Sequence, residues 1–215
     1  MVKSANGWLR LTPKRKTGCH PALGGDCDNI RRRLSTSYSN RAMMPHPLVD
    51  QLRFTRAEFI RATKGVSDDD ARRRFLPLNC LAWNVGHLAW QEQRYFLYYG
   101  GEGRLLLPEI DREFTYGAPA SEPSLKEMLA AWRTITAAAD PWLDTFTSEM
   151  LASHVISQGK PIQRTHGNLL QRVIYHYWYH TGENMAMRQL LGHERLPVYV
   201  GDIDGKAPYR PEQQI

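Results

Sequence analysis

One segment, residues 165–192, repeats apolar side chains at the period of an α-helix over its whole length. It contains His176 and His180, and a spacing of four residues places two side chains on one face of a helix. Either Thr165 or Asn168 can cap its start. Apolar residues continue the histidine face at helical spacing, namely Leu169, Val173, Met187 and Leu190. The pattern therefore predicts a long helix whose two imidazoles point inward.

A buried pair of imidazoles needs polar partners, because a ring nitrogen without a hydrogen bond is costly to bury. A metal ion is the one partner that can engage both His176 and His180 at once. The rest of the chain must then supply a third ligand and a cavity.

Length and composition are those of an ordinary globular protein. The chain has 215 residues, enough for one domain with a hydrophobic core, and it is 42% hydrophobic and 23% charged. No apolar run reaches the roughly 18 to 20 residues that a membrane span needs, so we expect no membrane partner. Three cysteines without a regular framework indicate a reducing compartment, so we expect a cytoplasmic protein without structural disulfides.

The net charge of +6 is concentrated at the N-terminus. Residues 1–43 hold nine Lys and Arg against two Asp, a net of +7, which leaves −1 for the rest of the chain. A near-neutral body lacks the electrostatic footprint of a DNA-binding domain, so we expect no nucleic-acid partner. We expect residues 1–43 to be a disordered basic extension, with Met43 or Met44 as an alternative start. A transit peptide and a nucleic-acid arm are the other possibilities.

Two more long helices and a short one precede the middle of the chain. An amphipathic helix is predicted to begin near Leu48 and end at Gly65, followed by a short capped helix over residues 67–74. A second long helix is predicted over residues 80–100, with Asn79 as its cap. This helix has apolar residues on most of its surface, so we expect it to be largely buried.

His87 lies in the middle of the helix predicted over residues 80–100. Trp83 and Trp90 lie one turn away on either side, and the small Gly86 would let another helix approach closely. A single histidine on an apolar face is more often a hydrogen-bonded core residue than a metal ligand. Helical spacing alone therefore does not identify His87 as the third ligand.

Residues 100–123 have no regular period and form a long connection, which favours a crossover. A third helix is predicted over residues 125–146, started by a capping box of Ser124 and Glu127 and kinked or restarted at Pro141. A small hairpin is a further possibility within residues 147–164.

Four amphipathic helices predict an all-α fold, a four-helix bundle in up-down-down-up order with a long crossover between its second and third helices. The predicted bundle spans residues 44–195, and residues 196–215 are predicted to form an irregular C-terminal arm.

Two segments of the chain resemble the DinB superfamily, which includes YfiT-like metalloproteins. They are LNCLAWNVGHLAWQE and, some ninety residues later, GNLLQRVIYHYWYHTGE, and the resemblance covers residues 45 to about 195. It implies a four-helix bundle with a crossover and a metal triad of one histidine from the second helix and an H-x-x-x-H pair from the fourth. Those positions match His87, His176 and His180. Thr181 departs from the family, in which a basic residue is frequent there.

Three neutral imidazoles from rigid helices form an open site for Zn²⁺, Ni²⁺ or Fe²⁺, with Zn²⁺ as the first expectation. Such an ion keeps its double positive charge and lowers the pKa of bound water or thiol. Glu183, close to the same stripe, is the predicted catalytic residue, as an acceptor behind a ligand, a fourth ligand or a base. An exposed salt-bridging acid is the alternative, and Glu92 is a weaker candidate. A bound ligand is predicted to contact aromatic side chains, namely Trp83, Trp90 and Tyr179.

The resemblance implies a bacterial, metal-dependent transferase or isomerase that uses a low-molecular-weight thiol such as mycothiol or bacillithiol. Its expected partner is a small-molecule electrophile or thiol, and a homodimer is expected. A metal-dependent hydrolase is the enzymatic alternative. The alternative from another class is a non-catalytic, stress-associated module that keeps a metal for stability.

Overall fold

The computed structural model describes residues 44–101 and 103–211, which belong to one compact unit, Met43–Ile215. The predicted basic extension lies outside the described residues. The elements, in chain order, are α2 (Pro47–Thr63), α3 (Asp68–Arg72), α4 (Leu81–Glu92), the π-helix η1 (Gln93–Tyr98), α5 (Pro108–Phe114), α6 (Leu125–Leu143), α7 (Ser148–Ala152), β1 (His154–Ser157), β2 (Lys160–Thr165), α8 (His166–Leu190) and α9 (Ile203–Lys206).

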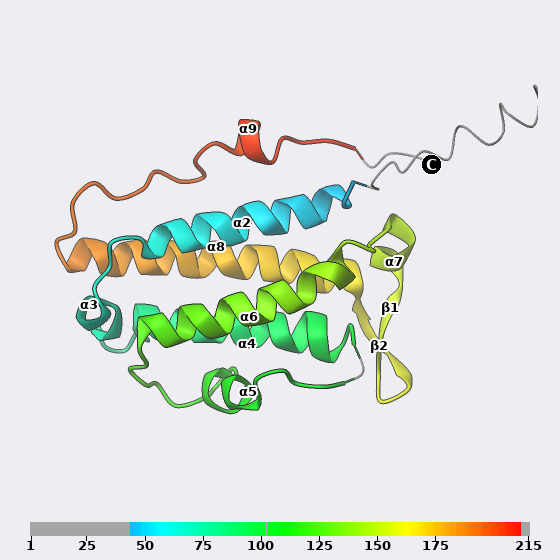
Figure 1. Ribbon diagram of the computed structural model, residues 1–215, viewed down its shortest axis with the longest axis horizontal. Helices are drawn as coiled ribbons and strands as arrows, with labels where there is room; N and C mark the ends of the chain where they lie inside the picture. The colour runs from blue at the N-terminus through cyan, green and yellow to red at the C-terminus, as the bar shows by residue number, and fades with distance from the viewer. Residues whose placement is uncertain (1–43, 102, 212–215) are drawn as a thin grey trace, which may run out of the picture. The chain divides into compact units, whose positions relative to one another are not determined.

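Four long helices, α2, α4, α6 and α8, form the body of this unit, which confirms the predicted all-α fold (Figure 1). Helix α4 packs along α6, α2 packs along α8, and α4 also contacts α8. The colours of Figure 1 show that α2 and α8 run in one direction and that α4 and α6 run in the other. The pairing of α4 with α8 brings together the two helices on which histidines are predicted to bind a metal.

The connection between α4 and α6 is not wholly irregular, because it contains the helix α5 (Pro108–Phe114). Only Ile110 and Phe114 of α5 are buried, so two apolar residues over two turns give too short a pattern to be recognised in the sequence. Pro108 at the first position of the helix was the available start signal. Helix α5 packs on α4 at the level of the candidate site.

Two predicted helix caps are wrong. The cap of α4 is Cys80 rather than Asn79, and its Sγ accepts a hydrogen bond from the backbone N–H of Trp83 at 3.4 Å. Ser124 makes no capping bond to α6 through its side chain. Instead, Asp68 of α3 accepts the backbone N–H of Leu125 at 2.7 Å. A capping side chain from a distant segment cannot be read from a local motif.

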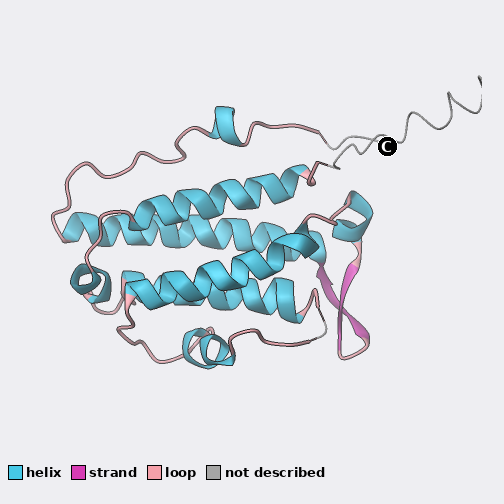
Figure 2. Cartoon of the chain, in the orientation of Figure 1, coloured by secondary structure: helices cyan, strands magenta, loops and turns pink. Residues whose placement is uncertain are grey.

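At the other predicted boundaries the structure agrees in most cases. Thr165 caps α8, since its hydroxyl accepts the N–H of Asn168 at 3.2 Å. Strands β1 and β2 form the predicted hairpin, the magenta element of Figure 2, and its turn residues Gln158 and Gly159 both have positive φ, as a type I′ turn requires. Helix α6 continues through Pro141 to Leu143, so the predicted restart there is wrong.

The core contains a buried polar network that joins all four long helices. Arg56 of α2 donates to the carboxylate of Glu92 on α4 and, at 2.7 Å, to Asp140 on α6. Tyr177 of α8 donates its hydroxyl to Glu92 at 2.8 Å and accepts the indole N–H of Trp132 on α6. Glu92 therefore belongs to the structural core, and the sequence-based suggestion that it supports the metal is wrong.

Two further features bear on the sequence predictions. Leu190, which was predicted to continue the buried stripe of α8, lies in the last turn of the helix and is 64% exposed. Among the described residues, no helix combines the length and apolarity that a transmembrane segment needs.

Candidate metal centre

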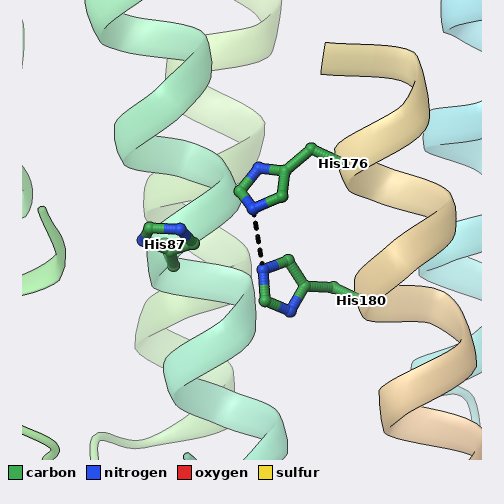
Figure 3. Close-up of side chains that lie close together, drawn as sticks. All are labelled: His87, His176 and His180. Carbon is green, nitrogen blue, oxygen red and sulfur yellow. Dashed lines mark hydrogen bonds between the residues drawn. The ribbon is translucent and has the colours of Figure 1, made fainter. Parts of the chain in front are cut away.

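The structure brings three histidines from two helices together. His87 projects from α4, and His176 and His180 project from adjacent turns of α8 towards it (Figure 3). One ring nitrogen from each residue lies within 4.8 Å of the other two. The Nε2 atoms of His176 and His180 are 3.0 Å apart. The sequence predicted this group, and it is the one candidate metal-ligand group found among the described residues.

Hydrogen bonds behind two of the rings determine which nitrogen faces the centre. The Nδ1–H of His87 donates to the backbone carbonyl of Phe114 at 2.7 Å. The Nδ1–H of His180 donates to Oε2 of Glu183 at 2.7 Å. Both rings are therefore in the tautomer that leaves the Nε2 lone pair free, which is the arrangement that supports a metal-bound histidine. Glu183 acts here as the acceptor behind a candidate ligand, one of its three predicted roles.

His87 is held in a fixed plane by its neighbours on α4. Its ring stacks between Trp83 and Trp90, at centroid distances of 4.9 and 5.1 Å and interplanar angles of 16° and 21°. Next to it, Gly86 has no room for a side chain, because an added Cβ would lie 2.7 Å from the ring of Phe114. Gly86 therefore allows α5 to approach closely enough for the carbonyl of Phe114 to reach His87.

Burial keeps two of the three imidazoles neutral. It lowers the pKa of His87 to about 4, and it lowers the pKa of His176 to about 3, with the nearby imidazoles adding to the shift. Neutral imidazole is the form that binds a metal, since protonation would occupy the lone pair. At neutral pH, His87 and His176 therefore need not lose a proton before they bind a cation.

The donor set fits a divalent cation. The Nδ1 atom of His176 is buried and finds no hydrogen-bond partner among the described residues. Since Nε2 of His180 has no proton to give, the close contact between the two Nε2 atoms allows one hydrogen bond at most. A cation would instead engage all three Nε2 lone pairs, and three nitrogen ligands are typical of open sites for Zn²⁺ and related ions.

A cavity of about 850 Å³ opens beside the triad. Its walls are mainly aromatic and polar, formed by His87, Trp90, Gln91, Tyr95, Tyr116, Arg164, Asn168, Gln171, Arg172, Tyr175, His176 and Tyr179. Of the aromatic residues predicted to contact a ligand, Trp90 and Tyr179 line this cavity. Trp83 does not, because it lies behind His87 in the core, where it is 4% exposed.

Sequence reasoning missed the polar lining of the cavity. Gln91 follows His87 by one helical turn, so its spacing could have placed it on the histidine face. Arg172 precedes His176 by four residues and could have been found in the same way. Arg164 lies on β2, and no local pattern indicates that the hairpin reaches the site.

The remaining described histidines serve other purposes. The Nδ1 of His46 accepts the N–H of Leu48 at the start of α2. His193 bonds to Arg188 and Asp70, and His154 bonds to the carbonyl of Ile162. His166 begins α8 and packs against Trp142. These residues lie in caps, loops and element ends.

Comparison with known proteins gives one family match. Residues 51–183 match the family model described as the DinB superfamily. Among solved structures, the chain is similar to a DinB-like protein from Bacillus cereus, with 16% sequence identity, coverage of 71% of this chain and 95% of that chain, and a TM-score of 0.49. No curated protein matches the chain.

Proposed function

The chain belongs to the DinB superfamily, and on that premise we propose that it is a metal-dependent enzyme. It either transfers a low-molecular-weight thiol to a small electrophile or uses the thiol to isomerise that electrophile. The observation that carries the proposal is the convergence of three imidazoles on one point at the edge of a cavity. A site built for stability alone needs no adjacent cavity of about 850 Å³.

Each residue of the centre has a definite part in this proposal. His87, His176 and His180 would hold a divalent cation, with Zn²⁺ as the first expectation and Ni²⁺ or Fe²⁺ as alternatives. Such a cation supplies Lewis acidity, which favours the deprotonated form of a thiol or water. Glu183 fixes the tautomer and direction of His180, and Trp90 with Tyr179 forms the aromatic wall against which a substrate lies.

The first experiment measures metal. Purified protein is reconstituted with Zn²⁺, Ni²⁺ or Fe²⁺, dialysed and analysed for bound metal. We expect about one equivalent in the wild type and a loss of most of it in His87→Ala, His176→Ala and His180→Ala, because two imidazoles hold a cation far more weakly than three. His154→Ala is the matched control, since this histidine is exposed, begins strand β1 and is not one of the three candidate ligands. A wild type that retains only a small fraction of an equivalent would refute the site.

The second experiment separates an enzyme from a non-catalytic module. The loaded and metal-free proteins are compared for consumption of an electrophile, such as 1-chloro-2,4-dinitrobenzene, with and without added thiol. Turnover that needs both metal and thiol supports the transferase. Metal-dependent ester hydrolysis without thiol supports the hydrolase. If stoichiometric metal raises the melting temperature but neither reaction occurs across a range of thiols and electrophiles, the non-catalytic alternative is favoured.

A further inference from the structure

The cavity beside the triad contains two arginines and no acidic lining residue. Arg164 comes from strand β2 and Arg172 from helix α8, so two separate elements contribute an exposed arginine to the lining of one cavity. None of the described residues that line it is an Asp or Glu. The described lining of the cavity therefore contributes two positive charges and no negative one, even before a cation is counted.

Neither guanidinium has a partner within the described part of the chain. Other described arginines form salt bridges, for example Arg53 with Asp144 at 2.8 Å. No such pair, and no side-chain hydrogen bond, involves Arg164 or Arg172 among the residues described. Because a guanidinium offers five N–H donors in a rigid fork, a free pair in one cavity matches the oxygens of a carboxylate or phosphate.

A buried amide gives a second, independent sign of a polar ligand. Gln91 is 4% exposed and lines the same cavity, yet its Oε1 has no hydrogen-bond partner among the described residues. A buried polar atom without a partner costs free energy, so such an atom beside a cavity indicates a group that arrives with the ligand. Gln91 lies one turn after His87 on α4, and both residues line the cavity.

We infer that the cavity binds a small molecule through an anionic oxygen group, a carboxylate or a phosphate, held by Arg164 and Arg172. Gln91 meets a polar part of the same molecule closer to the triad, and the aromatic wall of Trp90, Tyr175 and Tyr179 covers its apolar part. This inference rests on the proposed function in taking the reacting group to lie at the three histidines. It adds the substrate class: an anionic thiol or anionic electrophile is preferred over a neutral or cationic one of the same size.

The main test compares matched thiols on the loaded protein. Co²⁺ replaces the native cation, and binding is followed by the charge-transfer absorption that a sulfur ligand gives. We expect 3-mercaptopropionate to bind more tightly than 2-mercaptoethanol, and cysteamine to bind most weakly. An exposed charge pair is worth up to roughly 1 kcal/mol. Arg172→Gln and Arg164→Gln should therefore each weaken the affinity for the anionic thiol by up to about fivefold and leave the affinity for 2-mercaptoethanol unchanged. Acetate and inorganic phosphate, added as competitors, show which oxyanion is preferred.

Two controls make the result specific. Arg133→Gln removes an exposed arginine of α6 that does not line the cavity, and it should preserve the preference for the anionic thiol. Bound Co²⁺ is measured in every variant, because an unchanged metal content separates loss of the anion site from loss of the metal site. Equal affinities for the anionic and neutral thiols in a fully loaded wild type would overturn the inference and leave the metal proposal intact.

A further arm uses the metal-free protein, so that a failure of the metal proposal does not decide the anion site. The fluorescence of Trp90 is taken as the difference between the protein and its Trp90→Phe variant, and it is quenched with iodide, caesium or acrylamide. At low salt we expect iodide to quench the Trp90 fluorescence of the wild type better than caesium does. In the double variant Arg164→Gln with Arg172→Gln, quenching by iodide should be about twofold weaker than in the wild type, and quenching by acrylamide should be unchanged. Equal quenching by iodide in both proteins would overturn the inference.

Discussion

Glu183 fixes the tautomer and the orientation of the His180 ring at the candidate metal centre. Its Oε2 accepts both the Nδ1–H of His180 at 2.7 Å and an amide N–H of Asn84 at 2.9 Å. This carboxylate therefore connects α8 to α4 directly behind the triad. A carboxylate at this position both fixes the ring and makes its free nitrogen a better electron donor.

Replacing Glu183 should weaken metal binding without unfolding the protein. Removal of such an acceptor typically costs about 10- to 100-fold in metal affinity, and we expect Glu183→Ala to fall in that range. Glu183→Gln retains an oxygen acceptor without the charge, so its loss should be smaller. Competition with a chelator of known affinity gives the constants. Glu127→Gln, an exposed acid of α6, is the control, and an unchanged affinity in Glu183→Ala would contradict the role.

Two of the helical glycines, Gly86 and Gly182, should respond oppositely to alanine. At Gly86 an added Cβ would lie 2.7 Å from the ring of Phe114 and 2.8 Å from the sulfur of Met128, whereas at Gly182 nothing lies within 4 Å. We expect Gly86→Ala to lose about 1–3 kcal/mol by overpacking. Gly182→Ala should gain up to about 1 kcal/mol from helix propensity. Denaturant unfolding measures both, and a stabilising Gly86→Ala would show that α5 gives way easily.

The sequence was sufficient to predict the three histidines of the triad but not the other residues that line the cavity. His176 and His180 share a helix, so their spacing alone placed them together. His87 joined them through the resemblance to a known family, because helical periodicity cannot say which helices are neighbours. Arg164 could not be assigned at all, since its position in the cavity depends on how a hairpin folds back over α8.

At the scale of elements, one side chain of α3 caps the N-terminus of α6. Asp68 accepts the N–H of Leu125 at 2.7 Å and the hydroxyl of Ser124 at 3.2 Å. The hydrogen bond from Leu125 lowers the pKa of Asp68 below its ordinary value. A short helix thus closes the start of a long one, across more than fifty residues of sequence.

The cap should make stability depend on pH in the acid range. Because the pKa of Asp68 is lower in the folded protein than in the unfolded chain, its contribution is present above the ordinary value of 3.8 and is lost as pH falls through the folded pKa. Asp68→Asn should therefore lower the melting temperature at pH 7, and the difference from the wild type should shrink below about pH 4. Asp69→Asn controls for the charge of this turn. A difference that stays constant down to pH 2 would contradict the cap.

Length decided which helices could be recognised from repeated apolar residues, whereas the five-residue helix α3 was predicted from its capping signals. The four long helices show several repeats of the apolar pattern, which is enough to recognise them. Helices α5 and α7 have seven and five residues, so they show the pattern barely once. The hairpin was indicated by its turn, because Gln158 and Gly159 adopt the positive φ that two-residue turns demand.

At the scale of the whole molecule, the bundle leaves apolar side chains on its surface. Leu190 on α8 is 64% exposed, Ile156 on β1 is 54% exposed, and Val198 beyond α8 is 80% exposed. A second copy of the chain would cover such side chains, so we expect a homodimer. Sedimentation at micromolar concentration should give twice the protomer mass of 24.7 kDa. A species at 24.7 kDa across the micromolar range would exclude it.

The buried network of Arg56 and Glu92 has a consequence for how this family can diverge. Loss of one partner leaves an uncompensated charge in the core, at a cost of about 3–5 kcal/mol, whereas an apolar pair of similar volume can be neutral or stabilising. We therefore expect a single substitution at either position to be selected against and a matched double replacement to be tolerated. Among natural relatives the two positions should change together: a base at position 56 goes with an acid at position 92, or both residues are hydrophobic.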